Sequence, residues 1–259
     1  MMISDQLCTA AGLKWLVPDW PAPAQVRAVS SLRSGGVSGS LYQGLNLGDH
    51  VNDDPAAVRE NRSRLTQALK LPSTPCWLTQ VHGVTVVNVA RIQASAVEAD
   101  AAMTTQAGIV CAVLTADCLP LLFCDRQGSR VAAVHAGWRG LAAGIVEAAV
   151  QALDVPANEL LVWLGPAIGP AVFEVGAEVR NAFMVYDGEA QQAFQIRDQN
   201  GKQGRYLADI YLLARLRLQR LGVESIYGGH WCTYSQPDDF YSFRRDGVTG
   251  RQASLIWIA

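Results

Sequence analysis

The sequence predicts an α/β or α+β fold in which helices cover mixed β-sheets. Short apolar runs rich in Val, Ala and Leu, bounded by Gly, Pro and Asp, are concentrated in the middle of the chain and are typical of strands. Segments with apolar residues at helical spacing lie on both sides of these runs. Half of the 259 residues are hydrophobic and 17% are charged, which indicates a sizeable core rather than a disordered chain.

The N-terminal part of the chain predicts one strand and one helix. Residues 1–24 contain three prolines and are expected to have little regular structure. A strand is expected at 25–32, followed by a glycine-rich loop at 33–39 that lacks the spacing of a P-loop or Rossmann motif. Asp54 and Pro55 are typical of a helix start, as N-cap and first helical residue.

The centre of the chain predicts further strands and a buried helix. Residues 140–153 are apolar almost all round, which is typical of a helix inside the core. Strands are expected where apolar runs end at turn residues, at 84–89, 108–114, 119–124 and 131–134.

The C-terminal part predicts two helices separated by a polar excursion. The first helix is expected at 174–184, and the polar, Gln-rich segment 187–204 is expected to be exposed. Asp209 is expected to cap the second helix, which ends at Gly222. Strands are expected at 160–164, 225–227 and 253–258.

Charge, hydropathy and cysteine content indicate a cytoplasmic protein and give no reason to expect nucleic-acid or membrane partners. The formal net charge of −2 gives no electrostatic reason to expect nucleic-acid or membrane-surface binding. No apolar run reaches the ~18 residues of a membrane span, and residues 1–7 lack the pattern of a secretory signal. Four of the six cysteines lie in or beside apolar runs of a chain long enough to fold without disulfides, so free thiols are expected.

Three short stretches each place a metal ligand or nucleophile beside a turn. His82 precedes Gly83 and an apolar run, Cys118 lies between two apolar runs, and His135 closes another. Taken singly, each residue is more often a packed core side chain than a ligand. Together, at strand ends, two imidazoles and one thiolate give a three-ligand zinc site with an open fourth position, which is typical of catalytic zinc.

Other polar residues near these stretches have a structural and a functional interpretation. Asp117 ends an apolar strand, and a buried unpaired carboxylate costs several kcal/mol, so we expect a backbone donor or an imidazole as its partner. Arg139 pairs with a substrate anion or with Asp117, and Trp138 is expected to pack in the core. His50 and His230 lie in polar loops and are expected to be solvated.

The three stretches resemble the signature segments of a known family. His82 in TQVHG, Cys118 in TADCLP and His135 in HAGWRG look like those of the YfiH-like proteins, also called the multicopper polyphenol oxidoreductase or laccase-domain family, now regarded as purine nucleoside phosphorylases. The resemblance extends in order to SLRSGGVSG, GLNLG, ENRSRL, GPAIGP and YSFRRDGVTGR, from about residue 25 to the C-terminus.

This resemblance implies a fold, a metal and a reaction. The implied fold is an α+β four-layer α/β/β/α sandwich with mixed sheets, a single catalytic domain over 1–259 that is monomeric and cytoplasmic. The implied cofactor is zinc bound by His82, Cys118 and His135. The implied reactions are phosphorolysis of adenosine, inosine and methylthioadenosine, and deamination of adenosine.

Phosphorolysis requires cations that hold phosphate against the sugar. Our candidates are Arg33 in the glycine-rich loop and the adjacent Arg244 and Arg245, which follow alternating aromatic and polar residues. Asn46 is a candidate for contacting ribose or phosphate. Adjacent residues of an extended segment point to opposite faces, so we expect only one of Arg244 and Arg245 to contact phosphate.

Three alternatives to this function remain at this stage. A multicopper oxidase needs many histidines, mostly as His-x-His pairs, whereas this chain has four histidines and no such pair, although a His₂Cys site can bind copper. A cysteine hydrolase would use Cys118 as nucleophile and His135 or His82 as base. A zinc-stabilised binding protein would use the same ligands without catalysis.

Overall fold

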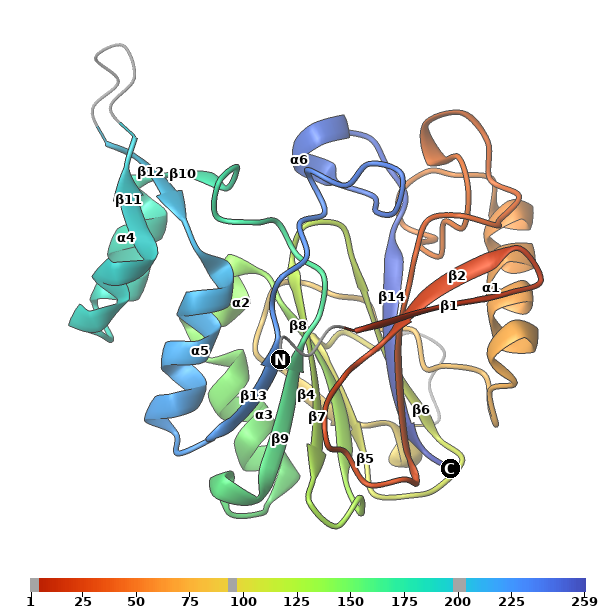
Figure 1. The fold of residues 1–259 in the computed structure, drawn as a ribbon, viewed down its shortest axis with the longest axis horizontal. Coiled ribbons are helices and arrows are strands. Elements are labelled where there is room, and N and C mark those ends of the chain that lie inside the picture. The colour runs from red at the N-terminus through yellow and green to blue at the C-terminus, as the bar shows by residue number, and fades with distance from the viewer. Residues whose placement is uncertain (1–4, 93–96, 198–203) are drawn as a thin grey trace.

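The computed structural model describes residues 5–92, 97–197 and 204–259, and one of its layers is a five-stranded sheet. The strand order is β1-β2-β3-β14-β6, and every neighbouring pair in it is antiparallel. The last strand of the chain therefore lies between an early strand and a central one (Figure 1). The strands are Gln6–Ala10 (β1), Leu13–Val17 (β2), Val26–Ser31 (β3), Val110–Thr115 (β6) and Gln252–Ile258 (β14).

A second layer is a six-stranded mixed sheet with strand order β13-β9-β7-β8-β5-β4. Its two outer pairs, β13 with β9 and β4 with β5, are parallel, and the inner pairs are antiparallel. The strands are Val86–Asn88 (β4), Ala101–Thr104 (β5), Leu119–Asp125 (β7), Val131–Ala136 (β8), Leu160–Leu164 (β9) and Ser225–Gly228 (β13).

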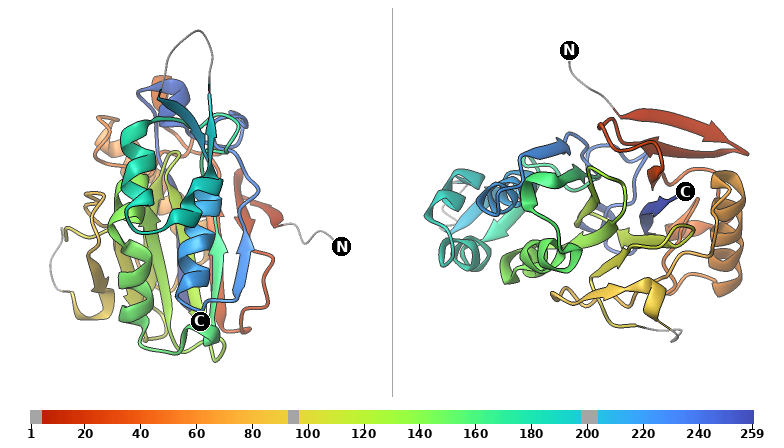
Figure 2. Two further views of the ribbon diagram at one scale, coloured as in Figure 1. Left: turned by 90° about the vertical axis from the view of Figure 1, so that its left-hand side faces the viewer. Right: turned by 90° about the horizontal axis from the view of Figure 1, so that it is seen from below.

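The two sheets face each other, and helices cover their outer faces. Successive side chains of a strand point to opposite faces, so Ile256 of β14 packs between the sheets while Leu255 packs beneath α1. In β7, Leu122 likewise faces the other sheet and Leu121 faces the helices. Figure 2, right, shows α1 on one side of the sheets and α3 and α5 on the other, which confirms the four-layer arrangement. These helices are Pro55–Leu69 (α1), Trp138–Ala143 (α2), Ile145–Leu153 (α3) and Ile210–Arg220 (α5).

The predicted helix caps are confirmed. The Asp54 side chain accepts a hydrogen bond from the backbone N–H of Ala56, with Pro55 as the first helical residue of α1. The Asp209 side chain accepts from the N–H of Leu212 at the start of α5. Among the described residues, no helix is both long and apolar enough to cross a membrane.

Parts of two predicted segments, 174–184 and 187–204, form strands of a third, small sheet. It has the order β10-β12-β11 and carries helix α4 beside it. The predicted helix 174–184 therefore begins only at Ala177, because its first three residues pair with β12. The predicted excursion 187–204 contains a 3₁₀ segment and β11, and its residues 198–203 lie outside the described residues. The elements are Glu174–Gly176 (β10), Ala177–Met184 (α4), Phe194–Ile196 (β11) and Arg205–Ala208 (β12).

The prediction of little regular structure before residue 25 is wrong from Gln6 onwards. β1 and β2 form an antiparallel hairpin whose two turn residues, Ala11 and Gly12, both have positive φ, as a two-residue hairpin turn of the primed type requires. Leu13 and Leu16 are buried by this arrangement. The three prolines that suggested irregular structure all lie after β2.

Two other predicted elements have different boundaries. The predicted helix 140–153 is divided into α2 and α3 by Gly144, which has φ 106° and ends the first helix. The predicted strand 84–89 is reduced to β4, and 3₁₀ helix η2 (Val89–Arg91) follows it. In addition, residues 243–246, expected to be part of an extended segment, form a single helical turn, α6 (Phe243–Asp246). Short 3₁₀ helices also occur at Ser40–Tyr42 (η1), Ala157–Glu159 (η3) and Gly188–Ala193 (η4).

Candidate metal centre and active site

The structure brings His82, Cys118 and His135 together in one cavity of about 480 Å³. Their ligand atoms all lie within 4.8 Å of one another, and Cys118 Sγ lies 3.8 Å from His82 Nε2. Cys118 directly precedes β7 and His135 lies on β8, and these two strands are paired antiparallel. His82 is exposed in a loop, Cys118 is half-buried and His135 is buried. The cluster is therefore anchored in the sheet and open on the side of His82.

The buried carboxylate of Asp100 orients both histidines. Its Oδ1 accepts hydrogen bonds from His135 Nδ1 at 2.8 Å and from the His82 backbone N–H at 2.9 Å. Its Oδ2 accepts from the backbone N–H of Gly83 at 2.6 Å and of Val81 at 3.3 Å. Because the carboxylate accepts at Nδ1, the Nε2 lone pair of His135 is left to bind a metal. The same bonds hold the 81–83 turn, in which His82 has φ 61°.

Sequence analysis missed Asp100, although one signal was present. It stands between Ala99 and the apolar residues of β5, and it is fully buried. Burial raises the pKa of Asp100, but the hydrogen bonds from His135 and from the Gly83 and His82 backbone outweigh that effect and lower the pKa overall. Asp100 is therefore an ionised acceptor at neutral pH.

Two glycines of HAGWRG leave the space that the cluster occupies. A Cβ on Gly137 would lie 2.7 Å from His82 Cδ2 and 3.1 Å from Cys118 Sγ. A Cβ on Gly140, in the first turn of α2, would lie 2.9 Å from the Gly83 carbonyl oxygen. Contacts this short do not occur between ordinary side chains, so both positions require glycine. The spacing of the motif thus follows from the close approach of α2 to the 82–83 turn.

The electrostatics of the cluster suit a metal. Burial raises the pKa of the Cys118 thiol, but His135 and His82 outweigh it and lower that pKa to about 6. Burial lowers the pKa of His135, but Cys118 and Asp100 outweigh it and raise that pKa to about 9, so without a metal His135 carries a second proton beside the Cys118 thiolate, and a bound metal ion would replace that proton. A thiolate and two imidazole nitrogens are the donors that zinc prefers. With the orienting carboxylate and the space beside Gly137, the residues present fit a bound zinc ion.

Asp117 has a backbone donor as a partner, which was one of the two partners expected for its carboxylate. Its Oδ1 accepts from the Thr233 hydroxyl at 2.6 Å, and its Oδ2 accepts from the Arg244 backbone N–H at 2.6 Å. The Asp117 carbonyl oxygen also accepts from the Ile168 N–H in GPAIGP. Asp117, with φ 89°, therefore joins the turn that carries Cys118 to two distant segments.

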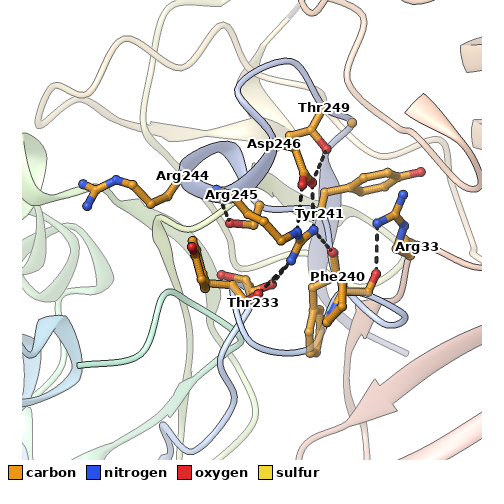
Figure 3. Close-up of polar contacts among 12 residues, drawn as sticks. Arg33, Thr233, Phe240, Tyr241, Arg244, Arg245, Asp246 and Thr249 are labelled. Atoms are coloured by element: carbon orange, nitrogen blue, oxygen red, sulfur yellow. Dashed lines mark hydrogen bonds and ion pairs between the residues drawn. The ribbon is translucent and has the colours of Figure 1, made fainter. Parts of the chain in front are cut away.

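The two adjacent arginines lie in different environments. The Arg244 side chain lines the cavity that contains Cys118, donates to the Glu174 carbonyl oxygen at 2.6 Å and lies over the Phe173 ring. Arg245 instead donates to backbone carbonyls, including that of Thr233, and to the Asp246 carboxylate. Figure 3 shows the two guanidinium groups pointing in different directions. They differ because the segment is a helical turn, and only Arg244 reaches the cavity.

Arg33 and Asn46 do not line the cavity with Cys118. Arg33 donates to the carbonyl oxygens of Pro237 and Gln43, lies over the Tyr241 ring and lines a separate polar cavity beside the glycine-rich loop. Asn46 is fully buried. Its Oδ1 accepts from the backbone N–H of Gly48 and of Arg251, so its hydrogen bonds hold backbone segments together.

Several cavity residues were not predicted as site residues. Arg251, Phe243 and Thr115 line the cavity with the cluster. His50 also lines it and, in agreement with the expected solvation, its side chain is 54% exposed. Burial, followed by the nearby Arg251, lowers the pKa of His50. Arg139 lines the same cavity, and among the described residues it makes no ion pair with Asp117; its guanidinium group lies over the Trp138 ring at 4.5 Å.

The chain is similar to known proteins along nearly its whole length. A family model described as multi-copper polyphenol oxidoreductase laccase matches residues 27–259. Purine nucleoside phosphorylase PA4543 of Pseudomonas aeruginosa is 57% identical over 244 residues, covering 94% of this chain and 98% of that protein. Purine nucleoside phosphorylase YfiH of Escherichia coli is 54% identical over 245 residues, covering 95% of this chain and 99% of that protein.

Solved structures with a similar fold are also known. A Neisseria meningitidis protein matches with a TM-score of 0.89 at 50% identity, covering 94% of this chain and 98% of that one. YlmD from Geobacillus stearothermophilus matches with a TM-score of 0.84 at 31% identity, covering 98% of this chain and 99% of that one. The fold is therefore shared over nearly the full length of each chain.

Proposed function

Because this chain belongs to the multi-copper polyphenol oxidoreductase laccase family, and relatives 57% and 54% identical to it are named purine nucleoside phosphorylase, we propose that it is a purine nucleoside phosphorylase. The observation that carries the proposal is one cavity in which the His82–Cys118–His135 cluster lies with the guanidinium group of Arg244. The proposed substrates are adenosine, inosine and methylthioadenosine, with inorganic phosphate as the second substrate. These are small molecules, and a cavity of about 480 Å³ is of the size that holds such ligands.

We propose that His82, Cys118 and His135 hold one zinc ion per chain. Bound there, zinc would supply a Lewis acid that polarises a substrate oxygen. Copper also binds thiolate and imidazole, and the family description names copper. The four histidines of the whole sequence are, however, too few for the several coppers of a multicopper oxidase, so zinc with incidental copper binding is the assignment that the donor set supports.

The proposed phosphorolysis balances without an external reagent. An oxygen of hydrogen phosphate forms a bond to C1′ of the nucleoside while the bond from C1′ to N9 breaks, and the electron pair leaves with the base. The proton of the hydrogen phosphate ends on the base, which gives ribose 1-phosphate and the free purine. Arg244 would orient the phosphate by charge-assisted hydrogen bonds. Asp100 would hold His135, and the Asp117 hydrogen bonds would hold the turn that carries Cys118.

We also propose adenosine deamination at the same cavity. Water would replace the 6-amino group, and ammonia would leave. Both carboxylate oxygens of Asp117 already accept hydrogen bonds, so His50 is the cavity residue better placed to move the proton.

The test is an assay of inosine cleavage across a phosphate titration, with hypoxanthine release as the signal. We expect release to depend on phosphate and ribose 1-phosphate to accumulate in equal amount. If hypoxanthine appears at the same rate without phosphate, the reaction is hydrolysis and the phosphorylase proposal is wrong.

A cysteine hydrolase is the second candidate, favoured by the 3.8 Å approach of Cys118 Sγ to His82 Nε2 and by the lowered pKa of Cys118. The two candidates differ in metal dependence. The zinc enzyme predicts that Cys118→Ala lowers zinc occupancy and activity together, whereas Cys8→Ala on β1 retains both. The hydrolase predicts activity that resists chelators and a covalent adduct on Cys118.

We further propose that residues 1–259 act as a single, monomeric catalytic domain in the cytoplasm, without nucleic-acid or membrane partners. All six cysteines are unpaired, which supports a reducing compartment. The near-neutral net charge gives no electrostatic attraction to polyanions.

A further inference from the structure

Arg251 lies beside the turn that carries Cys118, although the two residues are far apart in sequence. The antiparallel pairing of β14 with β6 sets Gln252 opposite Thr115. Arg251 directly precedes Gln252, and Thr115 lies three residues before Cys118. Arg251, Thr115 and Cys118 all line the cavity of the metal cluster. The sheet itself therefore places this arginine in the wall of the cavity that contains Cys118.

The backbone of Arg251 is held rigidly by the loop that contains Asn46. Asn46 Oδ1 accepts from the Arg251 backbone N–H at 2.9 Å, and the Arg251 carbonyl oxygen accepts from the Leu47 N–H at 3.1 Å. The orientation of the guanidinium group is fixed by Nη1, which donates to the carbonyl oxygens of Thr249 and Gly250 at 2.9 and 3.0 Å. In the described part of the chain, Nε and Nη2 of Arg251 have no acceptor, so this side of the fork is available to a ligand.

The charge of Arg251 is not balanced by an ion pair. No carboxylate of the described residues lies within 4.0 Å of its guanidinium group, in contrast to Arg62 and Arg217, which are paired with Asp49 and Glu147. Burial lowers the pKa of Arg251, while Cys118 and Asp117 act in the opposite direction. A partly buried cation without a counter-ion is costly unless an anion binds to it.

Thr115 adds a hydroxyl group without a partner. Its side chain is 2% exposed, and its Oγ1 has no hydrogen-bond partner among residues 5–92, 97–197 and 204–259. Buried hydroxyl groups are normally hydrogen-bonded, so an unpaired one in a residue that lines a cavity is a candidate partner for a ligand that enters there.

We propose that Arg251 and Thr115 form the subsite for the attacking phosphate, with Arg251 as its principal cation. This inference rests on the proposed phosphorylase function. A planar guanidinium fork with two available donors, beside a hydroxyl group, matches a tetrahedral oxyanion. A neutral nucleoside would leave the charge of Arg251 unbalanced. Asn46 is then a positioning residue, because it holds the Arg251 backbone without reaching the cavity.

The first experiment measures phosphate dependence in variants of Arg251. Arg251→Gln should raise the apparent KM for phosphate tenfold or more, about 1.4 kcal/mol, and leave the KM for inosine within about threefold. Arg251→Lys should be intermediate, because it keeps the charge and loses the fork. The matched control is Arg64→Gln, on the solvent-facing side of α1, which should leave both KM values unchanged.

The second experiment measures phosphate binding without turnover. Inorganic phosphate should raise the Tm of the wild-type protein, and this rise should be lost in Arg251→Gln while zinc content is retained. An unchanged phosphate KM and an unchanged Tm rise in Arg251→Gln would overturn the subsite, even if the enzyme is a phosphorylase. If the wild-type reaction is independent of phosphate but the Tm rise is lost in Arg251→Gln, the phosphorylase function is wrong and the anion site stands.

A third variant keeps the proposal testable if Arg251→Gln does not fold. Thr115→Val keeps the volume of the side chain and removes only the hydroxyl group. We expect the KM for phosphate to rise about three- to tenfold, as for loss of one hydrogen bond to a charged ligand. An unchanged phosphate KM in Thr115→Val would exclude the hydroxyl group from the subsite.

Discussion

At the scale of single residues, Asp100 has the largest influence on the candidate metal centre. Its carboxylate accepts four hydrogen bonds, one from an imidazole and three from successive backbone N–H groups. It thereby sets the tautomer of His135 and the position of His82 at once. A carboxylate that is fully buried is tolerated only because all of its bonds are made.

Asp100→Asn should therefore weaken zinc binding. The amide has one acceptor oxygen, so it leaves either His135 or part of the 81–83 turn without its bond. We expect zinc affinity to fall about 10- to 100-fold, with a loss of about 1–3 kcal/mol in the free energy of unfolding. Competition with a chromophoric chelator and urea titration measure the two effects. Asp154→Asn, whose side chain is 90% exposed, is the control, and unchanged zinc affinity in Asp100→Asn would contradict this role.

The cysteines should differ in reactivity and in its pH dependence. Only the thiolate is alkylated, and the pKa of Cys118 is lowered to about 6, so its ionised fraction no longer increases above pH 7. Burial, followed by the nearby Asp125, raises the pKa of Cys124 to about 12, and burial raises the pKa of Cys111 still further. Their thiolate fractions are therefore small at pH 8 and increase with pH.

Iodoacetamide labelling of chelator-treated protein, read by peptide mass mapping from pH 7 to 9, measures this difference. We expect Cys118 to react first, at a rate nearly independent of pH, and to be protected by added zinc. Labelling of Cys111 or Cys124 as fast as Cys118 in folded protein would contradict the prediction.

The metal-ligating candidates were predictable from sequence, and the residues that position them were less so. His82, Cys118 and His135 each stand beside a turn at a strand end, which is a local signal. Asp100 and Arg251 act through contacts between segments far apart in the chain, and no local pattern marks these contacts. Arg245 looked equivalent to Arg244 in sequence, and only the helical turn of α6 separates their directions.

At the scale of elements, the approach of α2 to the 82–83 turn determines the shape of the site. The helix begins directly after the strand that carries His135, and Gly137 is its N-cap. Sequence analysis expected one helix over 140–153, because the apolar pattern continues through Gly144. The positive φ of Gly144 ends α2 instead, and α3 begins at Ile145.

Gly137→Ala should disrupt the metal cluster more than the fold. The added Cβ would lie 2.7 Å from His82 Cδ2, so His82 or Cys118 must move. We expect zinc affinity to fall about tenfold or more and the free energy of unfolding to fall by about 1–3 kcal/mol. Gly188→Ala is the matched control, because its Cβ would meet no atom within 4 Å. Equal zinc affinity in the two variants would show that the space beside Gly137 is not required.

At the scale of the whole molecule, the core between the two sheets holds the strands that position the candidate site. Continuous apolar runs made most of the inner strands predictable, because these strands are buried on both faces, whereas β1, β2 and β5 were not predicted. The pairing order was not predictable from sequence, since it joins β14 to β3 and β6 across most of the chain length. The hairpin of β1 and β2 was missed because its turn, Ala11-Gly12, is a weak local signal.

Ile256→Ala tests the contribution of the inter-sheet core. Ile256 is fully buried between the sheets, so truncation leaves a cavity and should cost about 2–5 kcal/mol. Ile196→Ala, at a site 79% exposed, should change the free energy of unfolding by less than about 0.5 kcal/mol. Denaturant titration of both variants gives the comparison. A loss in Ile256→Ala no larger than in Ile196→Ala would contradict this packing.

The position of β14 also has a consequence for the order of events during synthesis. The ribosome releases the chain from its N-terminus, so β3 and β6 emerge long before the strand that lies between them. Until β14 leaves the exit tunnel, both strands have a hydrogen-bonding edge with no neighbour. The same late segment carries Thr233 and the Arg244 N–H, which hold the turn before Cys118. The turn before Cys118 therefore gains these hydrogen bonds only after residues 233–244 have emerged, and we expect the proposed zinc ion to bind after that point.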